Sequence, residues 1–294
     1  MRHLLTETLS IPTNGIRLHA EAAGPRDGRL VILLHGFPEY WGGWINQIGP
    51  LSQAGLRVLA PDQRGYNLSD KPKAVADYAI DLLAKDVLGI IDHFGREKTC
   101  LVGHDWGAAV AWYVASHYPQ RVEKLAILNV PHTAAINRAL QKPLLGQWRK
   151  SWYIFAFQTP RLPEWGLRRR SFKALRDSMI HTSRPGTFSE EEFIRYREAW
   201  SQPGALTGGI NWYRAMLRQG FRLGPKQGTA KFQRRVTAPT LILWGDQDAF
   251  LEPVLADWSL AWVDDGRVVH FPHATHWIAH EEADAVNREL IAFL

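Results

Sequence analysis

The stretch from Thr99 to Trp112 constrains the fold of this chain more than any other. An apolar strand, Cys100 to Val102, runs into the turn Gly103-His-Asp-Trp-Gly107, and a helix of small residues follows. This pattern is typical of a nucleophile elbow, a tight strand-to-helix turn that presents the residue between its two glycines to an active site. Asp105 holds that position. We therefore expect an α/β fold with Asp105 as a candidate nucleophile.

The type of residue at the elbow narrows the chemistry. An aspartate, with an ordinary pKa of about 3.9, is already anionic at neutral pH and needs no base to attack. Asp105 could attack a saturated carbon directly, opening an epoxide or displacing a halide, and would then be held as an ester. A histidine would be free to activate water against that ester. The alternative is that Asp105 merely forms a turn.

Composition indicates a large globular chain. With 294 residues, 46% of them hydrophobic, it can bury a sizeable core as one domain with an insertion or as two joined domains. The net charge is +6, and ten lysines and arginines face one glutamate between positions 138 and 176. A solvated helix face accounts for this charge, since no nucleic-acid-binding motif accompanies it.

The lone cysteine and the apolar runs bear on location. Cys100 is the single cysteine, which rules out an internal disulfide and suits a reducing compartment. The first ten residues lack a long apolar core, so we expect no signal peptide. No run approaches the roughly 18 apolar residues of a membrane span. We expect a cytoplasmic protein with no membrane span.

The order of elements predicts a mostly parallel sheet with helices on both faces and a site at the carboxyl ends of its strands. Aromatic and basic residues dominate positions 131–236, which we expect to form a helical cap inserted over that edge. Residues 1–130 and 237–294 would form the core. We expect two short strands within 4–23, followed by strands at 30–34, 57–60, 100–102, 122–130, 240–244 and 267–271. Helices of the core are expected at 44–51, 78–94 and 282–294. The helices of the cap are expected to break at Pro160, Pro163, Pro185, Pro203 and Gly220.

Two acids follow the strand 240–244 and could partner Asp105. They are Asp246 and Asp248, and the chain order nucleophile, acid, histidine suits this architecture. We favour Asp248, because it lies further past the strand end, where a loop can turn it inward.

Three histidines follow the next strand. His276 is favoured as the base because it lies in the loop between His273, close after the strand, and His280, at the start of the last helix. No zinc-binding helix motif is present, so no metal is expected. The backbone N–H groups of Phe37 and Trp106 are candidates for an oxyanion hole.

These motifs together resemble those of the α/β-hydrolase-fold epoxide hydrolases, over nearly the whole chain. His35-Gly-Phe-Pro38 is similar to the family's H-G-x-P loop, and Gly103 to Gly107 to its elbow. Gly245 to Asp248 and His276-Trp277 are similar to its acid and histidine segments. Thr275 departs from the glycine that often precedes the histidine.

The cap segment distinguishes this family from the dehalogenases, which share the same triad of nucleophile, acid and histidine, here Asp105, Asp248 and His276. Tyr153-Ile-Phe-Ala-Phe-Gln158 and Asn211-Trp-Tyr-Arg214 resemble the two stretches that carry the family's cap tyrosines. The resemblance implies that Tyr153 and Tyr213 bind the epoxide oxygen, with Phe37 and Trp106 beside it. Phenols can donate to a developing alkoxide, which is a poor leaving group. Aromatic packing of the cap is the alternative role for either tyrosine.

The sequence therefore predicts an epoxide hydrolase that forms a vicinal diol through an ester on Asp105. His276, oriented by Asp248, would activate the water that hydrolyses this ester. A haloalkane or haloacetate dehalogenase, and a non-catalytic ligand-binding protein of the same fold, are the alternatives. No cofactor and no metal are implied. The expected partners are a small epoxide and water, with no nucleic acid, and a homodimer is left open.

Overall fold

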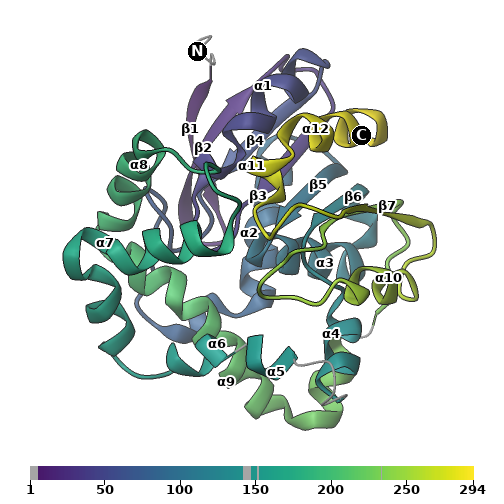
Figure 1. The fold of residues 1–294 in the computed structure, drawn as a ribbon. Coiled ribbons are helices and arrows are strands. Elements are labelled where there is room, and N and C mark those ends of the chain that lie inside the picture. Colours follow the sequence, from purple (N-terminus) through teal and green to yellow (C-terminus); the bar gives the residue numbers. More distant parts are fainter. Residues whose placement is uncertain (1–5, 142–146, 151, 233) are drawn as a thin grey trace.

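A computed structural model describes residues 6–141, 147–150, 152–232 and 234–294. An eight-stranded sheet with the order β1-β2-β4-β3-β5-β6-β7-β8 runs through its centre (Figure 1). The first two strands are antiparallel to their neighbours, and β3 to β8 are parallel. The strands are β1 (Glu7–Thr13), β2 (Ile16–Ala23), β3 (Leu30–Leu34), β4 (Arg57–Pro61), β5 (Thr99–His104), β6 (Val122–Leu128), β7 (Thr240–Gly245) and β8 (Gly266–Phe271).

The central strands are apolar because both faces of the sheet are covered. All five residues of β3 are buried. Ile32 and Leu34 point into one hydrophobic cluster, and Val31 and Leu33 into the other. Such continuous apolar runs distinguish a strand buried on both sides from the alternating pattern of a half-exposed one. The predicted α/β fold is confirmed.

Helices cover the two faces as separate groups. One face carries α1 (Ile45–Gln53), α11 (Ile278–Glu281) and α12 (Ala283–Phe293), and the other carries α2 (Ile80–His93), α3 (Trp106–His117) and α10 (Val254–Leu260). Short 3-10 helices lie at Trp41–Trp44, Val75–Tyr78 and Pro119–Arg121. All of the expected core strands and helices are present, with ends that differ by a few residues.

A helical segment separates β6 from β7, although these two strands pair side by side. We call residues 131–236 the cap (Figure 1). Its helices are α4 (Thr133–Leu140), α5 (Gln147–Lys150), α6 (Trp152–Ala156), α7 (Leu162–Thr182), α8 (Glu190–Ser201) and α9 (Ala205–Phe232).

Two of the expected helix breaks in the cap are wrong. Pro163 lies in the first turn of α7, where proline is tolerated because its missing N–H would have no partner within the helix. Gly220 lies inside α9. A glycine costs a helix only about 1 kcal/mol, which is small for a helix of 28 residues.

The α7–α8 side of the cap is fixed to the core by packing and hydrogen bonds. A third hydrophobic cluster joins Met179 and Trp200 of the cap to Tyr40 and Trp277 of the core. The Trp200 indole donates to the Pro38 carbonyl at 2.5 Å. These contacts make this part of the cap continuous with the core. Within the described ranges, none of the helices has both the length and the apolar character that crossing a bilayer requires.

Candidate active site

Asp105 lies on a strained turn between β5 and α3. Its φ of 49° and ψ of −122° are unfavourable for a residue with a side chain, and such strain is concentrated at functional sites. The elbow also packs closely against the end of β3, since a Cβ on Gly107 would stand 2.0 Å from the Leu34 carbonyl oxygen. One carboxylate oxygen, Oδ1, accepts a hydrogen bond of 2.7 Å from the Phe37 N–H. The other oxygen, Oδ2, is therefore the one available for chemistry.

The loops after β7 and β8 bring an acid and a histidine to the same edge of the sheet. His276 Nδ1 and Asp248 Oδ2 are 2.7 Å apart. His276 Nε2 stands 3.7 Å from Asp105 Oδ2, which is an ion-pair distance but too long for a hydrogen bond. The two carboxylates thus flank opposite nitrogens of one buried imidazole.

This arrangement decides the charge of His276. Burial alone would lower the pKa of the imidazole, but the carboxylates of Asp248 and Asp105 outweigh it and raise the pKa to about 10. The pKa of Asp105 lies below its ordinary value, because the neighbouring histidines and the Phe37 N–H overcome the effect of burial. The resting site is therefore an Asp105 carboxylate beside a His276 imidazolium.

Asn129, which the sequence did not single out, holds Asp248 in place. It follows β6 with a φ of 53°. Its Nδ2 donates to Asp248 Oδ2 at 2.7 Å, and its Oδ1 accepts from the Gly245 N–H at 3.0 Å. The other oxygen of Asp248 accepts from the N–H groups of Phe250 and Leu251. A polar residue at the carboxyl end of a central strand was the signal that could have identified it.

The other candidate acid and histidines have different partners. Asp246 bonds His270 at 2.6 Å, and both His270 and His273 are exposed. His280 Nε2 bonds Glu39 Oε1 at 2.8 Å. The structure thus brings Asp248 and His276 to Asp105, and places these three elsewhere.

Glu39 is the second residue that the sequence did not indicate. Its side chain is buried, and Oε1 accepts from the Tyr196 hydroxyl at 2.6 Å as well as from His280. His104 Nδ1 lies 3.3 Å from its other oxygen, and His104 Nε2 lies 2.8 Å from the His276 carbonyl. Burial would raise the pKa of Glu39, but the histidines hold it well below its ordinary value. The buried Glu39 carboxylate is therefore linked to the backbone of His276 through the ring of His104.

The two cap tyrosines lie against each other, next to the aromatic residues that flank Asp105. Tyr153 belongs to α6 and Tyr213 to α9, and their ring centres are 5.8 Å apart. Tyr213 contacts the rings of Phe37 and Trp106, at 5.6 and 4.9 Å. Burial, and then the charge of Asp105, raise the pKa of both phenols above the ordinary value. Both hydroxyls therefore keep their protons at neutral pH.

Further aromatic rings lie beside Tyr213 and His276. Phe157 lies 5.0 Å from Tyr213, and Phe250 lies 5.1 Å from the ring of His276. Neither had been singled out as a site residue. Around the polar groups the site is therefore apolar, which suits an uncharged organic ligand.

The loop before His276 accommodates the unexpected threonine. The Thr275 hydroxyl donates to Glu281 at 2.8 Å and accepts from the Trp277 N–H at 3.3 Å.

In the described parts of the chain, no group of three or more His, Cys, Asp or Glu side chains could hold a metal ion.

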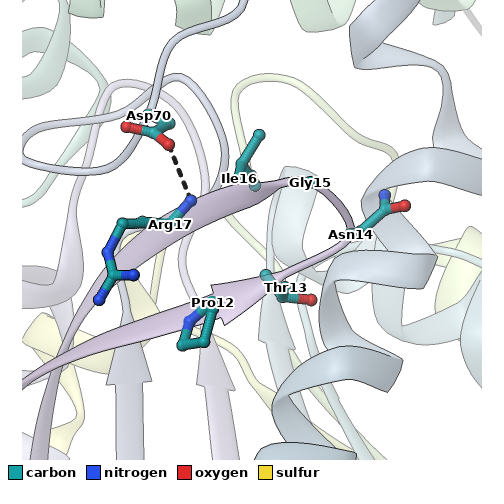
Figure 2. A pocket seen from close by; sticks show the side chains of 7 residues that line it. All are labelled: Pro12, Thr13, Asn14, Gly15, Ile16, Arg17 and Asp70. Atoms are coloured by element: carbon teal, nitrogen blue, oxygen red, sulfur yellow. Dashed lines mark hydrogen bonds between the residues drawn. The ribbon is translucent and has the colours of Figure 1, made fainter.

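A hollow at the surface lies apart from the triad. It has a volume of about 420 Å³ and is lined by the β1–β2 turn and by Asp70 (Figure 2). The Arg17 N–H donates to Asp70 at 2.8 Å across it. No member of the triad lines this hollow.

Comparisons with known proteins agree with this fold. A family model of the alpha/beta hydrolase fold matches residues 29–283. An AB hydrolase superfamily protein, YfhM of Bacillus subtilis, is 46% identical over 97% of this chain and 96% of its own length. Epoxide hydrolase 4 of Mus musculus is 37% identical, over 97% of this chain and 78% of its own. The crystal structure of Bacillus megaterium epoxide hydrolase with an inhibitor superimposes with a TM-score of 0.86 at 29% identity, covering 97% of this chain and 99% of that one.

Proposed function

Since the chain belongs to the epoxide hydrolases of the α/β-hydrolase fold, which hydrolyse an ether bond, we propose that it opens its epoxide through a covalent ester on Asp105. One observation carries this proposal. Asp105 has one oxygen held by the Phe37 N–H and the other directed to a charged His276 at 3.7 Å. An anion held this way can attack carbon without first losing a proton.

The first step opens the ring. Asp105 Oδ2 attacks a ring carbon, the carbon–oxygen bond of the epoxide breaks, and the electron pair stays on the former ring oxygen. Tyr153 and Tyr213 hold that oxygen, and one phenol gives it a proton. Formation of the ester removes the charge of Asp105, which had been raising the pKa of both phenols. The phenols therefore become better acids as the alkoxide forms.

The same loss of charge prepares the histidine. One of the two carboxylates that keep His276 protonated disappears when the ester forms, so the pKa of the imidazole falls. The imidazolium then gives up its proton to the tyrosinate, which restores the phenol that protonated the former ring oxygen. His276 becomes a neutral base only after the ester exists.

The second step hydrolyses the ester. His276 takes a proton from water, and the hydroxide attacks the ester carbon. The developing oxyanion forms on Oδ1, which already accepts the Phe37 N–H; the Trp106 N–H is the second donor. Collapse expels the diol oxygen, which takes a proton from the imidazolium. The carboxyl proton then passes to His276, so the free carboxylate and the imidazolium are restored.

A single-turnover experiment tests this route. With enzyme in excess over styrene oxide in water enriched in oxygen-18, the first diol should carry an ordinary oxygen from Asp105, and the label should appear in the Asp105 peptide. Direct attack of water would place the label in the diol and exclude the ester. In the His276→Gln protein, the peptide should gain the mass of the whole epoxide.

The exposed His273 provides the matched control. His273→Gln should turn over normally and show no trapped adduct, because this side chain lies outside the site. If His276→Gln instead turns over at the normal rate, His276 is not the base. Release of halide from a haloalkane, without any adduct from the epoxide, would identify a dehalogenase.

A further inference from the structure

Four large apolar side chains are exposed on one part of the cap. They come from α6 and from the first turn of α7. We call them the outer patch: Trp152, Phe155, Leu162 and Trp165, with 67, 50, 60 and 59% of their surface exposed. Each helix contributes two residues three positions apart, which share one helix face. Gathered apolar side chains of this size on a surface mark an interaction site.

One buried guanidinium fixes the two halves of the outer patch relative to each other. Arg214 of α9 donates to the carbonyls of Phe157 and Thr159, just after α6, at 2.9 and 2.8 Å. It also donates to Glu164, in the first turn of α7, at 2.6 Å. The patch is therefore a surface braced from beneath.

The rim of the outer patch is positively charged. Between positions 138 and 176 the sequence has a single acidic residue, Glu164, and its side chain, 13% exposed, is paired with Arg214. Its charge is thus neutralised from within. Four arginines near the patch are exposed: Arg161, Arg168, Arg169 and Arg170.

We propose that the outer patch docks onto the surface of an anionic lipid bilayer. Indole and aliphatic side chains beside arginines are the combination that binds at the level of lipid headgroups. Each basic residue near such a surface strengthens binding about fivefold.

Two other occupants fit less well. A symmetric pair of copies would bring two positive patches face to face. A nucleic acid would use the arginines, but it would leave the side chain of Leu162 without a suitable partner.

Docking there would have a consequence for the site, which rests on the proposed function. Helix α6 carries Trp152 on its exposed side and Tyr153 on the side that meets Tyr213. Apolar epoxides concentrate in bilayers. In a docked enzyme, only the width of α6 would separate Tyr153 from the bilayer that holds the substrate.

Flotation with lipid vesicles tests the docking independently of turnover. The protein should float with vesicles of phosphatidylcholine mixed with phosphatidylglycerol, but not with phosphatidylcholine alone. Replacing all three of Arg168, Arg169 and Arg170 by glutamine should weaken binding about a hundredfold. The double variant Trp152→Ser and Trp165→Ser should weaken it about tenfold. Circular dichroism of each variant checks that it is folded.

A matched variant controls for net charge. Lys73→Gln, Lys85→Gln and Lys98→Gln together remove three exposed charges from the core, and should change binding by less than about threefold. Equal losses in both triple variants would mean attraction by net charge alone and would overturn the proposal. Absence of flotation of the native protein would also overturn the proposal. The alternative of a dimer would then be indicated if the native protein dimerises with rising concentration and the double tryptophan variant does not.

Discussion

The charge of a single imidazole links the two halves of the proposed cycle. His276 lies between Asp248 and Asp105, and both anions favour its protonated form. Asp248 keeps its charge throughout, whereas Asp105 loses its charge when the ester forms. The site therefore needs no separate switch to convert an acid into a base.

The raised pKa of His276 predicts how stability depends on pH. The folded protein binds this proton more tightly than the unfolded chain, whose histidine has a pKa of about 6.5. The stabilisation is complete below pH 6.5 and is lost as the pH rises toward the folded pKa of about 10. The free energy of unfolding of the native protein, minus that of His276→Gln, should fall by about 1 kcal/mol or more between pH 7 and 10. Urea titrations measure this difference; one that is constant with pH would contradict the ion pair.

The cap tyrosines should act on ring opening alone. Tyr153→Phe and Tyr213→Phe each remove one donor to the epoxide oxygen, and should slow formation of the ester about ten- to hundredfold. Hydrolysis of the ester should change little, because its oxyanion is held by backbone N–H groups. Rapid-quench mass spectrometry separates the two rates. If both variants form the ester at the native rate, the tyrosines only pack the cap.

At the scale of elements, the site depends on how closely two turns approach each other. The loop after β3 passes against the elbow after β5, so that the Phe37 N–H reaches Asp105. A Cβ on Gly36 would stand 2.2 Å from the Cβ of Asp105. A glycine is required at this point to leave room for the Asp105 side chain.

Gly36→Ala should therefore disable the site by displacing the carboxylate. A shift of about 1 Å in a reacting group costs roughly a hundredfold in rate, and we expect a loss of that order in kcat. Gly166→Ala is the control, because a Cβ there meets nothing within 4 Å. Steady-state kinetics of the two variants measure the contrast. Equal activities would mean that the two turns can separate without cost.

Local patterns predicted the elements, but not the contacts between distant residues. The strands from Leu30 to Leu34 and from Thr240 to Trp244 were evident because buried runs are continuous. Nothing in the local sequence of Glu39 indicates His280, which lies 241 positions away. Gly220 does not end its helix, because the cost of one glycine, about 1 kcal/mol, is small for a helix of 28 residues.

At the scale of the whole molecule, the cap and the core share a hydrophobic cluster. Its members come from α7, α8 and α9, and from the core residues Tyr40 and Trp277. A shared core makes two parts of a chain unfold together. We therefore expect the α7–α8 side of the cap to behave as part of the core.

Two neighbouring residues of α7 test this coupling. Met179 is fully buried in the shared cluster, whereas Ile180 is 37% exposed. Met179→Ala should lower the free energy of unfolding by about 2–5 kcal/mol, and Ile180→Ala by less than about 1 kcal/mol. Unfolding in urea, followed by circular dichroism and by tryptophan fluorescence, should give coincident transitions in both variants. A separate early transition would show that the cap unfolds alone.

The order of the chain also sets when activity can first appear during synthesis. The His104 ring and the His276 carbonyl that it contacts are 172 positions apart, and the whole cap is made in between. At roughly 5–20 residues per second, the ribosome needs on the order of ten to thirty seconds to travel that distance. A nascent chain therefore carries Asp105 well before it carries His276, and the site can be completed only after the loop that follows β8 has emerged.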